Sequence, residues 1–180
     1  MLLPPMHHLL RSLLWLTLFS ISMGFLESSV VIYLRALYYP NGFQFPLVGI
    51  PMTMNLVELI REAATIIMLT SMGIIAGRNT AQRFAFFIYA FAVWDIFYYV
   101  FLKLALDWPH SLFTWDILFL IPVPWVVPVI DPCIVSITLI VLTLILIFAA
   151  DKVNHITQTF TTWLSQLPGS WVLLVTFVFN

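Results

Sequence analysis

Charged side chains interrupt three long apolar stretches of the sequence. Glu27 lies in the first stretch and Asp95 in the third, while the second holds Glu58, Arg61 and Glu62. A charge at the centre of a transmembrane helix costs about 2.5–3.5 kcal/mol on insertion scales, so such residues usually face other helices and find partners there. Carboxylates gathered in this way could order helix packing, handle protons or cations, or bind a divalent metal ion.

The second stretch places its polar residues on one face of a helix. That face follows a 3-4-3 spacing and consists of Asn55, Glu58, Glu62 and Thr65. Arg61 stands three residues after Glu58 and can reach its carboxylate. It cannot easily extend to the headgroups, because about 23 Å of expected helix separates it from either end. The sequence therefore predicts that Arg61 is the charge partner of Glu58 or of an acid on a neighbouring span.

The first and third stretches supply further polar faces. Beside Glu27, small residues repeat at four-residue spacing, which lets another helix approach closely: Ser20, Gly24 and Ser28. Asp95 is followed one turn later by Tyr99, whose hydroxyl could donate a hydrogen bond to it. We expect both faces to turn toward other helices.

The depths of three carboxylates coincide. Counted from the expected ends of their helices, Glu27, Glu58 and Asp95 each lie about 16–18 Å from the same face of the membrane. The sequence therefore predicts one buried layer in which the first three spans bring these acids together. Arg61 neutralises only one of them, and the others cannot all be ionised at close range, so some must hold a proton or a cation must be present.

The amino-acid composition indicates whether water or lipid surrounds these apolar stretches. Hydrophobic residues make up 62% of the chain and charged residues 8%, with a mean hydropathy of +1.05. Soluble domains are about 45–50% apolar and about 25% charged. The lipid bilayer must therefore surround most of this chain. The net charge of −1 gives no electrostatic reason to expect nucleic acid as a partner.

These observations predict an all-α integral membrane protein, a single bundle of about five transmembrane helices, with four or six as alternatives. The N-terminal span is expected to stay uncleaved, since no cleavage site closes a short apolar region. The expected spans cover residues 9–39, 46–77, 81–106, 112–130 and 131–150, with 153–180 at the interface or forming part of a sixth span.

The fourth expected span, 112–130, differs from the others because prolines would break a helix there. We predict a broken crossing or a re-entrant segment, followed by a helix capped by Asp131. Exposed backbone carbonyls of such a segment could line a cavity, although a simple kink would use the same residues. The candidate residues for this cavity or kink are Asp116, Pro122, Pro124, Trp125 and Asp131.

No nucleotide-binding, hydrolase or zinc-protease motif occurs in the sequence. A transmembrane haem is disfavoured because no histidine lies in the middle of a span. Glu58 and Glu62 have the spacing for two oxygen ligands on one helix face, which would suit Mg, Ca or Mn, but two carboxylates alone do not predict a metal site. Whether the chain is an enzyme stays open.

Lysines and arginines near the ends of the spans predict a cytoplasmic N-terminus. Three lie on the N-terminal side, Arg11, Arg78 and Arg83, against Arg35 and Lys103 on the other.

The favoured function is an integral subunit of a larger membrane assembly, for example an energy-converting one, whose buried carboxylates and arginine order helix packing. Its partners would be the lipid bilayer and other membrane subunits. The alternatives are a small proton- or cation-handling transporter and a metal-dependent membrane enzyme that uses the same acids.

Overall fold

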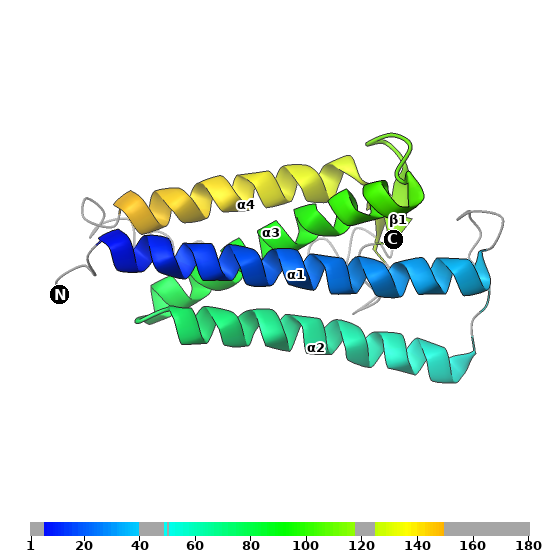
Figure 1. Cartoon of the computed structure of the whole chain (residues 1–180), viewed down its shortest axis with the longest axis horizontal. Coiled ribbons are helices and arrows are strands. Elements are labelled where there is room, and N and C mark those ends of the chain that lie inside the picture. Colours follow the sequence, from blue (N-terminus) through cyan, green and yellow to red (C-terminus); the bar gives the residue numbers. More distant parts are fainter. Residues whose placement is uncertain (1–5, 40–48, 50, 118–124, 150–180) are drawn as a thin grey trace, which may run out of the picture. The chain divides into compact units, whose positions relative to one another are not determined.

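The computed structural model describes residues 6–39, 49, 51–117 and 125–149. Four helices occur in this part of the chain, α1 (Met6–Tyr38), α2 (Met52–Ala76), α3 (Thr80–Leu106) and α4 (Ile130–Ala149) (Figure 1). All four are long and apolar enough to cross a membrane. The all-α prediction is therefore confirmed, but with four such helices in the described residues in place of five. The contacts below lie within the unit Met1–Leu144; the unit Ile145–Asn180 is described only to residue 149.

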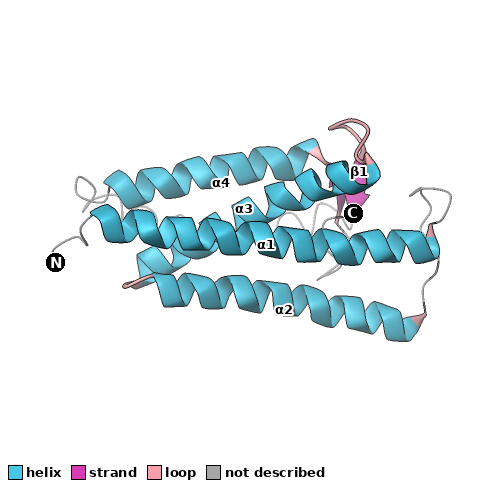
Figure 2. Cartoon of the chain, viewed as in Figure 1, coloured by secondary structure: helices cyan, strands magenta, loops and turns pink. Residues whose placement is uncertain are grey.

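Where it is described, the segment predicted as a broken crossing or a re-entrant segment contains two short strands and does not cross as a helix. Strand β1 (Trp115–Ile117) pairs antiparallel with strand β2 (Val126–Pro128), with Asp116 opposite Val127 (Figure 2). Strand pairing supplies backbone hydrogen bonds where prolines prevent a helix, and a two-stranded sheet has free edges at which proline is tolerated. The prolines at 122 and 124 lie outside the described residues.

Helix α4 begins before the predicted cap. Its first residue is Ile130, whose N–H donates to the carbonyl of Leu112 at 2.8 Å, and the N–H of Cys133 donates to the carbonyl of Val129 at 3.4 Å. These bonds start the helix directly after β2, so the prediction of Asp131 as cap is wrong. Asp131 lies in the first turn, where the helix dipole favours an acid.

Helix α3 is the central helix. Half of the residues of its apolar window are buried, against 28% for α1 and 22% for α2. Both α1 and α2 pack mainly against α3 and contact each other much less. The side chain of Asn79 caps the start of α3 by accepting from the N–H of Gln82 at 2.9 Å. At the other end the chain turns away at Asp107, which adopts a left-handed conformation with φ 51°.

Two glycines allow this close packing. A Cβ atom on Gly24 would lie 3.0 Å from the carbonyl oxygen of Trp94, and one on Gly73 would lie 2.7 Å from that of Arg83. The small-residue face of the first span therefore lets another helix approach, as its spacing predicts, and that helix is α3. The same face holds Ser20 and Ser28, both 0% exposed.

Candidate functional site: two arginine-centred networks

Arg61 on α2 binds two carboxylates. Its Nη1 contacts Oε1 of Glu27 on α1. Its Nε donates to Oε2 of Glu58 at 2.9 Å, and its Nη2 lies 2.8 Å from the same oxygen. The structure thus gives Arg61 both kinds of partner that its position predicts, a neighbour on its own helix and an acid of the first span. We call Glu27, Glu58, Arg61 and Thr65 the charged seam.

The spacing of α2 builds its side of the seam. The buried stripe of α2 consists of Glu58, Glu62, Thr65, Leu69 and Gly73, which is one helical face. Thr65, one turn after Arg61, donates to the carbonyl of Arg61 at 3.1 Å and lies 3.4 Å from Oε2 of Glu27. Glu62 is buried on this face, 8% exposed. Asn55, predicted on the same face, is exposed.

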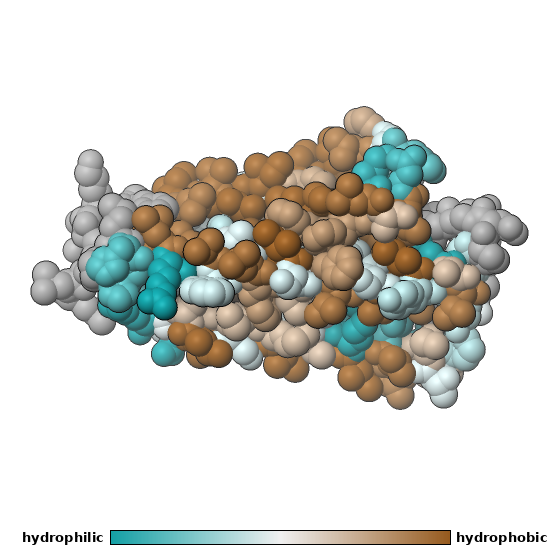
Figure 3. Space-filling model, viewed as in Figure 1, coloured by the Kyte–Doolittle hydropathy of each residue, from teal (hydrophilic) through white to brown (hydrophobic). Residues whose placement is uncertain are grey.

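The seam is not fully enclosed. Exposed fractions are 25% for the side chain of Arg61, 14% for Glu27 and 7% for Glu58. Figure 3 shows a hydrophilic patch between α1 and α2 in the mostly apolar middle of this face. Along the helices, Arg61 lies about 14 Å from Met52, and Glu27 lies about 16 Å from Tyr38. In a bilayer whose hydrocarbon core is about 30 Å thick, helix positions this far from the helix ends lie among the lipid tails.

Glu58 is nearer to its helix end than predicted. Because the described part of α2 starts at Met52, Glu58 lies about 9 Å along the helix from that end, in place of about 18 Å. The predicted start of this span at residue 46 lies outside the described residues. Glu58 still meets the same guanidinium as Glu27, because the side chain of Arg61 reaches both acids.

Asp95 is buried, 8% exposed, but its hydrogen bond runs to a different helix from those of the seam. Ser136 on α4 donates to Oδ2 of Asp95 at 2.8 Å. The carboxylate whose charge acts on Asp95 is Asp116. The predicted single layer is therefore present as two groups, one that joins α1 to α2 and one that joins α3 to α4.

A second arginine forms a network at one end of the bundle. Arg35, near the end of α1, lies 3.5 Å from Oδ1 of Asp116 on β1 and stacks 3.7 Å above the ring of Trp108. Tyr99 on α3 donates to Oδ2 of Asp116 at 3.1 Å, where the sequence predicts a bond to Asp95. We call Arg35, Tyr99, Trp108 and Asp116 the arginine hub.

The hub is nearly closed to solvent. Side-chain exposure is 10% for Arg35 and 4% for Asp116. Burial raises the pKa of Asp116 to about 6, while the Arg35 cation and hydrogen bonds from the Ile117 N–H and the Tyr99 hydroxyl act in the opposite direction. Asp116 is therefore a buried acid that titrates near neutral pH.

The sequence does not identify Arg35 as a site residue, because its place near the end of a span is also typical of a charge at the membrane interface. Its chemistry is the feature that could have identified it, because an arginine within a span needs a partner. Its carboxylate comes from β1, and no local spacing predicts that pairing.

Tyr98 on α3 connects the two networks electrostatically. Its hydroxyl lies within range of the charges of Arg35 and Asp116 in the hub and of Glu27 and Arg61 in the seam. The two networks also share helix α1, which supplies Glu27 to the seam and Arg35 to the hub.

The remaining candidate residues lie outside both networks. Trp125 is half-buried before β2, and Asp131 is exposed on α4. Pro122 and Pro124 lie outside the described residues. Within the part of the chain that the structure describes, no three of the His, Cys, Asp and Glu side chains gather as a metal site would require.

No protein-family model, curated protein or solved structure matches the chain. The geometry of the seam and the hub is therefore the basis for inferring function.

Proposed function

We propose that this protein is an integral subunit of a larger membrane assembly, in which a neighbouring protein segment covers the charged seam. The observation that carries the proposal is the partial exposure of Arg61, 25% of its side chain, on an apolar surface at lipid depth. The residues around it on α2 are exposed and apolar, including Val57, Ile60 and Met68.

The physical reason is the cost of a charge beside hydrocarbon. The contacts with Glu27 and Glu58 use three of the five N–H donors of the Arg61 guanidinium. Lipid tails cannot accept hydrogen bonds from the other two, and a polar group left without a partner there costs several kcal/mol. A second protein segment would supply acceptors and exclude lipid.

Proton or cation handling is the second candidate, because two carboxylates share one guanidinium in the seam. In that case water would reach the seam and the excess negative charge would be met by a proton or a cation. Proteoliposomes loaded with a pH-sensitive dye would then show a proton flux that Glu27→Gln abolishes. The assembly proposal predicts no such flux.

Native mass spectrometry of the protein extracted from its own membrane in lipid nanodiscs tests the assembly proposal. We expect a complex that contains at least one other chain. Val57→Trp, close to Arg61 on α2, should release that chain, while Leu59→Trp on the opposite face should retain it; these side chains are 56% and 40% exposed. Detection of the monomer alone, or the same retention of the second chain by both variants, would overturn the proposal.

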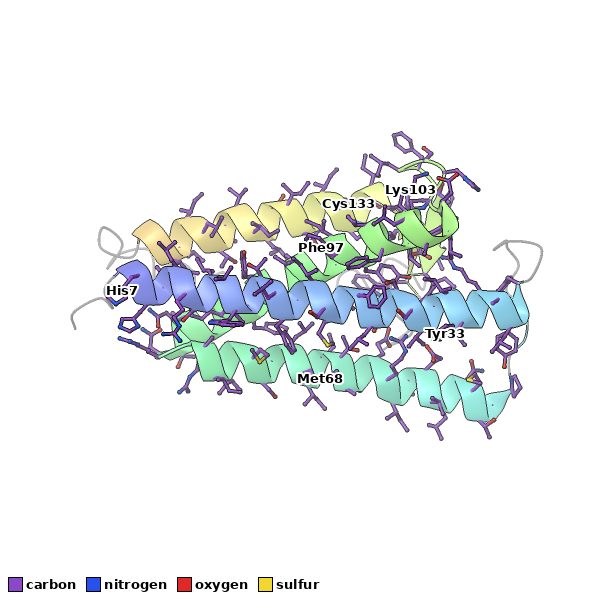
Figure 4. All side chains as sticks on the ribbon, viewed as in Figure 1. His7, Tyr33, Met68, Phe97, Lys103 and Cys133 are labelled. Atoms are coloured by element: carbon purple, nitrogen blue, oxygen red, sulfur yellow. The ribbon has the colours of Figure 1, made fainter. Side chains whose placement is uncertain are left out.

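We also propose a cytoplasmic N-terminus. The hub encloses Arg35, 8% exposed, so this residue no longer counts as a loop charge. Among the described Lys and Arg residues, Lys103 then stands alone at its end of the bundle, opposite the end that holds His7 (Figure 4). Arg11, Arg78 and Arg83 mark the cytoplasmic side by the positive-inside rule. Accessibility of a cysteine introduced at Arg11 to an impermeant reagent tests this orientation.

A further inference from the structure

We infer that the segment covering the charged seam is a transmembrane helix of another protein, with a lysine or arginine at the depth of Arg61. This inference rests on the proposed assembly and specifies the chemistry of the partner.

The charge of the seam supports a basic partner. Glu27 and Glu58 contact Arg61 and leave one negative charge in excess. From residue 36 to residue 77 the sequence contains no lysine and no arginine except Arg61. A basic side chain from outside would balance this excess and would meet carboxylates that are already positioned.

A second copy of this chain does not fit the seam in the same way. Two copies facing each other here would bring two negative excesses together in a medium of low dielectric, where like charges repel strongly. The apolar side chains beside Arg61 would instead contact the apolar body of a different helix. Val57 stands one turn before Arg61 and Met68 two turns after it, and they are 56% and 41% exposed.

A defined probe tests this chemistry. The full chain in proteoliposomes is mixed with a leucine-rich transmembrane peptide that carries one central lysine, or with the same peptide carrying glutamine there. A photo-crosslinking residue replaces Met68 near the seam or, as the matched control, Ile67, which lies about 120° around the helix from Arg61 and is 65% exposed. We expect the lysine peptide to crosslink at least fivefold more than the glutamine peptide from position 68, with no preference from position 67.

The carboxylates provide the second half of the test. Glu27→Gln leaves Glu58 and Arg61 as a balanced pair, so the preference for the lysine peptide should fall below twofold. Glu58→Gln should act in the same direction, and it serves as the second variant if Glu27→Gln does not fold. Equal crosslinking of both peptides, crosslinking between two copies of the chain, or a preference that survives both variants would overturn the inference.

The outcomes also separate this inference from the proposed assembly. A heteromeric complex found by native mass spectrometry, together with indifference to the lysine peptide, would leave the assembly standing and refute a basic partner at the seam. A lysine preference together with a purely monomeric native protein would refute the proposed assembly, although the seam would still prefer a basic helix.

Discussion

The arginine hub and the charged seam each place one guanidinium beside carboxylates in an apolar bundle, yet the protein surrounds the two charges to different degrees. Arg35 meets one acid, stacks on Trp108 and is 10% exposed. Arg61 meets two acids, and its side chain stays 25% exposed. Asp116 and the ring of Trp108 thus cover Arg35 within the chain. The seam has a second acid and a more exposed guanidinium, which is the basis for proposing a partner there.

The largest expected effect is that of Arg35→Leu in the hub. It leaves Asp116 buried without its cation and removes the stacking on Trp108. Loss of one partner of a buried ion pair costs about 3–5 kcal/mol. Thermal unfolding in detergent micelles should show a marked decrease in Tm.

Lys103→Leu is the control for this variant. It removes a pair between half-exposed Lys103 and exposed Asp107, which contributes little to stability because water screens both charges. If both variants melted within the same small interval, the hub would not be the closed network described above.

Asp116→Asn tests the hub through its pH dependence. Burial raises the pKa of Asp116 from 3.8 to about 6, so the folded protein holds this proton more tightly than the unfolded chain does. Its contribution to stability is complete below pH 3.8 and is lost as the pH rises through about 6. A pKa difference of this size corresponds to at most about 3 kcal/mol.

We therefore expect the slope of Tm between about pH 4 and about pH 7 to be flatter in Asp116→Asn than in the wild type, because the amide does not titrate. The measurement is thermal unfolding of both proteins across this range. A variant that kept the wild-type slope would show that other groups produce the pH dependence.

Arg61→Leu should cost less than Arg35→Leu, about 1–3 kcal/mol, because the guanidinium of the seam is partly exposed. The variant leaves Glu27 and Glu58 to repel each other. Protonation removes that repulsion, so acidification should partly restore the Tm of the variant. A melting curve that stays unchanged between about pH 5 and about pH 8 would mean that Arg61 is not the charge partner of this layer.

The smallest effect belongs to Thr65→Val, which removes a long contact with Glu27 and a bond to the carbonyl of Arg61. We expect a loss of at most about 1 kcal/mol. Thr138→Val is the matched control, since Thr138 donates at 2.8 Å to Ile134 on its own helix. Equal losses in the two variants would indicate that the contact between Thr65 and Glu27 contributes nothing to the seam.

The sequence predicts the parts of this fold that depend on local spacing. Apolar length determines the four helices, and the separation of three residues places Arg61 against Glu58. The small residue Gly24 indicates a close helix contact, and the structure shows α3 there. Each of these features is encoded within a few turns of one helix.

The rest depends on which distant segments meet. Asp95 binds Ser136 on α4, and Arg35 pairs with Asp116 on β1, contacts that no periodicity within a single span encodes. Strands of three residues are too short for an alternating pattern to be recognised, so the sequence predicts a broken crossing or a re-entrant segment over residues 112–130 and no strands. Without the strands the hub cannot be predicted either, because β1 supplies Asp116.

The pairing of β1 with β2 also determines whether the number of membrane crossings up to the end of α4 is odd or even. With a crossing between residues 112 and 130, the chain would leave α4 on the side opposite the start of α1. Because β1 and β2 return the chain to the end at which α3 stops, the described residues hold an even number of candidate membrane-spanning helices. Fluorescent or enzymatic reporters inserted before α1 and directly after α4 should then report the same compartment.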